Sequence, residues 1–200
     1  NDEIDAYVIF DADNVVHREF LNKMNDSINC GYEVVQGFRD TKNICDNWLS
    51  TSYAILYYLQ SLFINKSRFN FGMSSFLNGT GFMVKKETID RYGYDPKTIT
   101  EDIEYTAICA INGIKIAFNE NAITYDEQVT DFKSSLKQRK RWSFGAIQCL
   151  KNYTGSLIKE GIKNKRFECF DVIIFYFGII FHVLFTIVSL IGIFYNVFYL

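Results

Sequence analysis

Apolar positions along the first quarter of the chain change from a strand-like to a helix-like spacing and back. Residues 6–10 form a short β-rich run that ends in polar sequence, which predicts a buried strand followed by a loop. A helical repeat over 20–28 ends before Gly31, and residues 32–36 predict the next strand. A strand, a helix and a strand at this spacing predict an α/β fold.

The same pattern continues through the middle of the chain. Residues 48–64 carry no formal charge, but they include Ser, Thr and Gln. They predict a core helix, because a membrane span needs about 20 apolar residues. Residues 75–84 predict a strand that is interrupted by Gly79 and Gly81. The remaining predicted elements are helices over 87–92 and 101–112, a strand over 114–118, and a long basic amphipathic helix from 131 to about 153.

The C-terminal 29 residues, from Val172 to Leu200, contain no Asp, Glu, Lys or Arg and are rich in Ile, Phe, Val and Leu. The alternative, a buried core helix, is rare at this length for a segment that is apolar all round. The pattern therefore predicts a transmembrane segment over 171–200. Gly192 and Asn196 predict a turn into a second span, in a chain cut inside a multi-span membrane region.

Charge is distributed unevenly around a net value of −2. Residues 1–130 carry 11 basic and 19 acidic side chains, and residues 131–166 carry 10 basic and 2 acidic ones. The acidic balance gives no global basic field, so nucleic acid is not an expected partner. A basic flank before an apolar run predicts that 131–166 stays on the cytoplasmic side of a membrane. Five unevenly spaced cysteines without a Cys-x-x-Cys pair fit reduced cytosolic thiols.

Asp11 and Asp13 follow the first predicted strand directly. Open α/β folds bind ligands at the carboxyl edge of the sheet. Two carboxylates at that edge can hold a hard divalent cation together with phosphate oxygens. The alternative is a loop of solvated aspartates that caps the following helix.

The sequence Thr100-Glu101-Asp102 opens a predicted helix. One interpretation is a helix cap, since Thr is a good N-cap and acidic residues in the first turn favour the helix dipole. The other is a carboxylate at a cleft that takes a proton from a hydroxyl group. The dipole would lower the pKa of such a base, and nearby carboxylates such as Asp11 and Asp13 would offset that effect.

The most distinctive segment is Gln138-Arg-Lys-Arg141-Trp142. On a helix, Gln138, Arg141 and Trp142 stand at i, i+3 and i+4 and share one face. An amide, a guanidinium and an indole suit a sugar phosphate, because Arg grips phosphate oxygens and Trp offers a flat apolar wall. The alternative is a basic helix on anionic lipid with Trp at the interface.

These motifs occur in a fixed order, namely Asp-x-Asp after a strand, Gly-Thr-Gly, Thr-Glu-Asp, Gln-x-x-Arg-Trp and then an apolar segment. The ordered set closely resembles the membrane-embedded family-two glycosyltransferases, which include the bacterial synthases of cellulose, hyaluronan and poly-N-acetylglucosamine. The resemblance covers about residues 5–200. Region 131–150 most resembles the cellulose and poly-N-acetylglucosamine branches.

The resemblance implies a GT-A core, Rossmann-like, in a catalytic domain that faces the cytosol at a cell membrane. It implies Mg²⁺ or Mn²⁺ on Asp11 and Asp13, bound to the diphosphate of a UDP-sugar, and Asp102 as the general base. The substrate-binding residues that it implies are Glu101, Gln138, Arg141, Trp142 and the acceptor wall Gly79, Thr80 and Gly81. Only ten residues precede Asp11. We therefore expect 1–130 to be the second half of the domain, 131–170 an interface helix region, and the fragment alone to be inactive.

The expected function is inverting transfer of a hexose or N-acetylhexosamine from a UDP-sugar to a growing polysaccharide at the lipid bilayer. A second interpretation is a non-processive enzyme that makes a glycolipid, so the acceptor is a glycan or a lipid. A third, of another class, is an inactive scaffold that binds nucleotide sugar or acidic lipid. A metal-dependent phosphotransferase is disfavoured because the chain has no Gly-rich loop followed by Lys-Ser or Lys-Thr.

Overall fold

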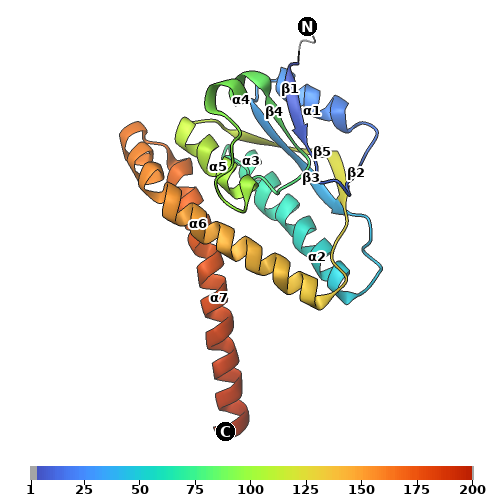
Figure 1. Ribbon diagram of the computed structural model, residues 1–200, viewed down its shortest axis with the longest axis vertical. Helices are drawn as coiled ribbons and strands as arrows, with labels where there is room; N and C mark the ends of the chain where they lie inside the picture. The colour runs from blue at the N-terminus through green and yellow to red at the C-terminus, as the bar shows by residue number, and fades with distance from the viewer. Residues whose placement is uncertain (1–3, 200) are drawn as a thin grey trace.

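A computed structural model describes residues 4–199, without the side chains of residues 179, 180, 182, 183 and 197–199. Figure 1 shows a sheet with helices packed around it and a C-terminal helix that extends away from it. The elements in order are β1 (Ala6–Ile9), β2 (Val15–Val16), α1 (Phe20–Asn29), β3 (Val34–Thr41), α2 (Trp48–Leu59), the π-helix η1 (Gln60–Lys66), α3 (Ser67–Asn70), β4 (Phe82–Lys85), α4 (Lys86–Tyr92), α5 (Glu101–Asn112), β5 (Ile116–Asp126), α6 (Phe132–Asn164) and α7 (Phe167–Tyr199).

The five strands form one mixed sheet in the order β1-β4-β3-β5-β2. Strands β3 and β5 are parallel, whereas β4 is antiparallel to both of its neighbours and β2 is antiparallel to β5. Strands β1, β3 and β5 therefore run in the same direction, and their carboxyl ends meet at one edge of the sheet. The prediction of an α/β fold is confirmed, and this edge carries the candidate site.

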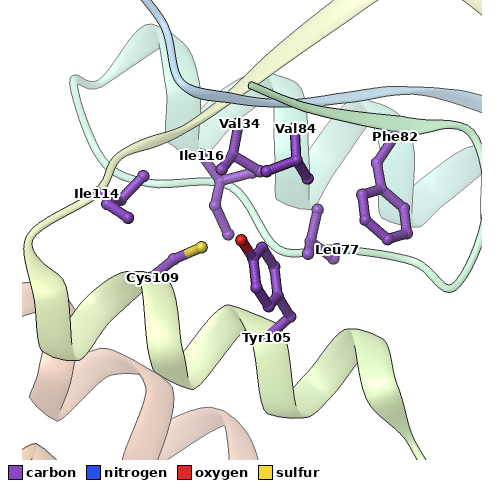
Figure 2. Packing of buried hydrophobic residues seen from close by; sticks show 8 residues of the cluster. All are labelled: Val34, Leu77, Phe82, Val84, Tyr105, Cys109, Ile114 and Ile116. Carbon is purple, nitrogen blue, oxygen red and sulfur yellow. The ribbon is translucent and has the colours of Figure 1, made fainter. Parts of the chain in front are cut away.

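Helix α5 packs on the sheet through an apolar core. Tyr105 and Cys109 of α5 contact sheet residues that include Val34, Val84 and Ile116, and all five are buried. Figure 2 shows Tyr105 and Cys109 projecting from the helix toward the strand side chains. Burying a side chain of this size contributes about 1.5–3 kcal/mol. The core therefore fixes the start of α5, where Asp102 lies, relative to the sheet.

A second core joins α5 to α6 and the first turns of α7. It contains Ala107, Cys149, Leu157, Val172 and Tyr176, all of them buried. The hydroxyl of Tyr176 donates a hydrogen bond to the carbonyl of Ile103, at 3.0 Å. In Figure 1, α6 crosses beside α5 and α2 before the chain turns into α7. The last two helices, α6 and α7, are thereby attached to α5, which carries the Thr-Glu-Asp motif.

Several predicted elements have different bounds in the structure. The predicted first strand is present as β1, but it lies at the edge of the sheet and is only partly buried. The prediction that this strand is buried is therefore wrong. Within 75–84 only Phe82–Lys85 forms a strand, because side chains rather than a neighbouring strand bond much of the preceding backbone. Gly192 and Asn196 lie inside α7 and mark no turn, since the Asn196 side chain donates to the Gly192 carbonyl within the helix.

The predicted transmembrane segment 171–200 falls on α7, except for Leu200, which lies outside the described residues. Among the residues that the structure describes, no helix has both the length and the apolarity needed to cross a membrane. The beginning of the segment belongs to the folded core, because Val172 and Tyr176 are buried there and Asp171 forms an ion pair with Arg68. The prediction of a transmembrane segment over 171–200 is therefore corrected for the described residues, in which the first turns of α7 pack against the sheet domain.

Candidate functional site

The loop after β1 brings Asp11 against the Gly79–Gly81 segment. The Gly81 amide donates to the Ile9 carbonyl at 2.9 Å, and the Asp11 amide donates to Thr80 Oγ1 at 3.1 Å. Asp13 follows in the same exposed loop. Two of the predicted motifs, which are 69 residues apart in sequence, thus lie side by side at the carboxyl edge of the sheet.

The start of α5 faces the same segment. A β-carbon placed on Gly79 would lie 3.5 Å from Asp102 Oδ2, and Gly79 has a φ of +82°. A residue with a β-carbon at this position would therefore carry backbone strain, and its β-carbon would be in van der Waals contact with Asp102. Asp102 is partly buried, and its other oxygen accepts a bond from the Ile103 amide at 2.8 Å. Asp102 borders the acceptor wall that the sequence predicts.

Thr100 does not act as a side-chain cap for α5. The helix begins after it without a side-chain capping bond, and its Oγ1 is buried with no hydrogen-bond partner. The side chain lies against α6, since a β-carbon on Gly145 would come within 2.3 Å of Thr100 Oγ1. The capping interpretation is wrong in the side-chain bond expected of Thr100, but Thr100 does occupy the N-cap position, and Glu101 and Asp102 lie in the first turn. The close contact places α6 beside the start of α5.

Loss of hydration and neighbouring acidic groups raise the pKa of Asp11 and of Asp102. Loss of hydration is the main cause that raises the pKa of Asp11, and the charges of Asp126, Asp13 and Glu101 add to it. Loss of hydration followed by the charge of Glu101 raises the pKa of Asp102 to about 6. A carboxylate with a pKa near 6 is better suited to take a proton at neutral pH than one with an ordinary pKa.

The charge of Arg39 acts on both of these carboxylates, and the sequence prediction missed this residue. Its Nε donates to Asp126 Oδ2 at 2.8 Å, its Nη1 donates to the Asn78 carbonyl at 2.6 Å, and its guanidinium lies 3.8 Å from the centre of the Tyr57 ring. Arg39 and Asp126 are both buried, on neighbouring parallel strands. The positive charge of Arg39 opposes the rise in the pKa of both Asp11 and Asp102.

Helix α6 carries the predicted Gln138, Arg141 and Trp142. The indole of Trp142 packs edge-on against Tyr53 of α2, with ring centroids 6.1 Å apart. Gln138 Oε1 is buried without a hydrogen-bond partner, whereas Arg141 is exposed. Within residues 4–199, no hydrogen bond or ion pair joins these three side chains to Asp11, Asp13 or Asp102. The structure thus brings Asp11, Thr80, Gly79 and Asp102 together.

A cavity of about 300 Å³ lies between Asp13 and the start of α6. Asp131 caps α6 by accepting bonds from the Lys133 and Ser134 amides, so the first amides of the helix already have a partner. Lys42 links two residues that line the cavity, because its Nζ donates to the Asp13 carbonyl and forms an ion pair with Glu127, both at 2.8 Å. The cavity gives a polar ligand access to Asp13.

The residues at this edge fit a hard divalent cation that is shared with a phosphate ligand. Among the described residues, no group of three or more His, Cys, Asp or Glu side chains forms a complete metal site. Mg²⁺ is commonly bound through one or two carboxylates, with substrate phosphates and water as the other ligands. Asp11 and Asp13 supply two carboxylates in a region of surplus negative charge, which a cation would relieve.

Two comparisons with known proteins bear on the family of the chain. Residues 7–200 match the family model described as "Glycosyl transferase family group 2". The chain is also 25% identical over 199 residues to a protein of Bacillus subtilis (strain 168) named "Probable glycosyltransferase YdaM". That match covers 88% of this chain and 44% of the relative, so the chain spans less than half the length of this relative. The mixed α/β sheet is consistent with a GT-A core. The chain belongs to glycosyl transferase family group 2.

Proposed function

We propose that the whole protein transfers a hexose or N-acetylhexosamine from a UDP-sugar to a hydroxyl group of a growing polysaccharide, with inversion at the anomeric carbon. The observation that carries this proposal is the meeting of Asp11, Thr80, Gly79 and Asp102 at one edge of the sheet. Family membership supports sugar transfer in general. The donor, the acceptor and the stereochemistry are our own additions to it.

Asp102 is the proposed general base. In an inverting transfer the acceptor hydroxyl attacks the anomeric carbon on the face opposite the leaving diphosphate, and the new C–O bond forms as the bond to the diphosphate breaks. Asp102 takes the hydroxyl proton in that step. The raised pKa of Asp102, about 6, supports this role because the group is ionised at pH 7 and still basic enough to accept a proton. A base of this kind is worth about 10²–10⁴ in rate.

Asp11 and Asp13 are the proposed ligands of Mg²⁺ or Mn²⁺. A divalent cation bound there would neutralise negative charge on a diphosphate leaving group. The chain's own contribution is to present the two carboxylates beside the Gly79–Gly81 segment, with the Asp11 backbone fixed by Thr80. Glu101, Gln138, Arg141 and Trp142 are proposed to contact the donor or the acceptor once both are bound.

The direct test is to incubate the full-length protein with radiolabelled UDP-glucose and, separately, with UDP-N-acetylglucosamine, and then to size the labelled product. We expect one of the two donors to label a polymer. Label in a single-sugar lipid product would favour the glycolipid alternative over polymer synthesis. No transfer from any nucleotide sugar to any acceptor, with UDP still bound, would favour the binding scaffold and contradict the proposal.

A further inference from the structure

We propose that Arg39 is a positioning residue for sugar transfer, which acts through the adjoining Asn78 carbonyl to hold the acceptor wall, Gly79–Gly81, in place against Asp11 and Asp102. The claim that Arg39 affects sugar transfer rests on the proposed function. The claim that Arg39 fixes the position of this segment rests on its hydrogen bond to the Asn78 carbonyl. Arg39 is buried, so its proposed effect passes through the backbone of that segment and through its charge.

The wall is a segment whose backbone is held largely by side chains. No strand includes residues 73–81, and the Asn78–Gly81 stretch turns through two glycines with positive φ, Gly79 and Gly81. Gln36 accepts from the Asn78 amide at 2.9 Å and donates to the Thr80 carbonyl at 2.9 Å. Arg39 donates to the Asn78 carbonyl. The position of the wall therefore depends on two buried polar side chains of β3.

Arg39 is itself fixed from several sides. Two of its nitrogens bond to Asp126, which also accepts from Gln128 Nε2 at 3.0 Å, and the Tyr57 ring lies against its face. Asp126 ends β5 and therefore lies at the same edge of the sheet as the proposed site. A guanidinium held in this way has little freedom to rotate, so its remaining donor, Nη1, sets the position of the Asn78 carbonyl.

The same arrangement continues toward α6. Tyr57 stacks on Tyr53 with centroids 6.4 Å apart, and Tyr53 meets the edge of Trp142. Tyr53 also shares a hydrogen bond of 2.8 Å with Ser135 and accepts one of 3.2 Å from Arg139 Nε. Arg39 thus connects the acceptor wall to the helix of the Gln-x-x-Arg-Trp motif through a packed row of rings.

The charge of Arg39 gives the proposal a second consequence. The groups that act on or respond to the charge of Asp102 are Glu101 on its own helix, Arg39 on β3, Tyr57 on α2, Tyr94 before α5 and Cys149 on α6. Arg39 is the basic side chain among them, and it favours the ionised form of Asp102. Removing its charge would raise the pKa of Asp102, so the rate would begin to fall at a higher pH as the solution is acidified.

The test compares Arg39→Met and Arg39→Lys with an Arg91→Met control in the full-length protein, because Arg91 is an exposed arginine on α4. Lysine keeps the positive charge but lacks the guanidinium group that bonds Asp126 and the Asn78 carbonyl at the same time. We expect both Arg39 variants to lower kcat by about 10- to 100-fold, as misplaced catalytic geometry does. The acid limb of the pH–rate profile should move to higher pH in Arg39→Met and stay in place in Arg39→Lys.

Backbone hydrogen exchange of residues 75–82 gives a readout that is independent of turnover. We expect about tenfold faster exchange there in both Arg39 variants and no change in the control. Unchanged exchange in Arg39→Lys overturns the proposal, and so does faster exchange with an unchanged kcat. If Arg39→Met does not fold, Arg39→Lys decides alone. If the unsubstituted protein transfers no sugar, the proposed function fails, and the exchange result still decides whether Arg39 holds the wall.

Discussion

The raised pKa of the Asp102 carboxyl group lowers the stability of the folded protein and favours the proposed role of this group as a base. Its pKa is raised to about 6, mainly because the folded protein removes water from it. Its charged form therefore costs free energy in the folded state, and that cost is present above the folded pKa and absent below the ordinary value near 4. The same loss of hydration makes the group a stronger base.

Asp102→Asn should therefore stabilise the protein at neutral pH. Asparagine has nearly the same shape without the charge, so we expect the free energy of unfolding to rise by about 1–3 kcal/mol at pH 7. The gain should vanish below about pH 4, where Asp102 is neutral in both states. Urea unfolding at pH 7 and pH 4 measures both values, with Asp95→Asn at an exposed loop position as the control. An Asp102→Asn protein that is less stable at pH 7 would contradict this account of the pKa.

Asp13→Ala tests the proposed cation at the residue scale. Asp13 is exposed beside the cavity, so its removal should leave stability within about 0.5 kcal/mol. Sugar transfer should fall sharply, and the remaining activity should lose its dependence on Mg²⁺ or Mn²⁺. Asp95→Ala is the matched control. Full activity of the unsubstituted protein in excess EDTA would contradict the cation site.

Single residues were predictable from sequence only where a local motif marks them. Asp11 and Asp102 stand in short motifs at the ends of predicted elements, and the structure places both beside the Gly79–Gly81 segment. Arg39 was missed because its partner Asp126 lies 87 residues away in the chain. A charged residue inside a strand is a weak signal until the neighbouring strand is known. The catalytic and binding roles of Asp11, Asp13 and Asp102 stay predictions, and so do those of Gln138, Arg141 and Trp142.

At the scale of elements, the contact between α5 and α6 determines how the Thr-Glu-Asp motif sits. Gly145 of α6 lies so close to Thr100 that a β-carbon would come within 2.9 Å of Thr100 Cβ as well as meet its hydroxyl. Gly155 of the same helix has no atom within 4 Å of that position. The two glycines therefore have opposite roles on one helix.

Gly145→Ala should push α6 away from the start of α5. We expect a loss of about 1–3 kcal/mol in the free energy of unfolding, together with slower transfer, because the added methyl group meets a packed side chain. Gly155→Ala, the matched control, should gain about 0.5–1 kcal/mol, since alanine favours an exposed helix. Thermal or urea unfolding measures both. Equal effects of the two substitutions would show that the close contact has no consequence.

Elements with a strong local signal were predicted well. Helix α5 has the predicted bounds, and Gly113 ends it in the left-handed conformation. Strand β5 extends beyond the predicted 114–118. The prediction ended at 118 because polar residues 119–121 interrupt the apolar pattern, and the register of β5 on β3 shifts at this point, after Gly37. The predicted helix over 48–64 changes into the π-helix η1 at Gln60. Buried Asn65 of η1 bonds the Phe76 backbone, a contact that no local pattern reveals.

At the scale of the molecule, α7 is attached to the sheet domain by its first turns. Arg68 of α3 forms a bidentate ion pair with Asp171, and both side chains are largely buried. Arg68 also lies 4.1 Å from the centre of the Phe76 ring. The pair joins elements that are 103 residues apart in sequence. The cytoplasmic location at a cell membrane and the division into regions 1–130, 131–170 and 171–200 stay predictions.

Arg68→Met should loosen this attachment. Removing one partner leaves Asp171 without its cation, so we expect a loss of about 3–5 kcal/mol if the pair behaves as a buried one. Asp171→Asn with Arg68→Met should recover part of that loss, because no unpaired charge remains. Urea unfolding of the single and double variants measures the coupling. Strictly additive losses would contradict a direct role for the pair.

The central claim is that Asp102 accepts the proton of the acceptor hydroxyl during sugar transfer. The most direct test measures transfer of labelled sugar by the full-length Asp102→Asn protein, alongside calorimetric binding of UDP to the same sample. We predict a fall in transfer of about 10²–10⁴-fold with UDP binding retained. Transfer at the unsubstituted rate, with donor binding intact, would contradict the claim.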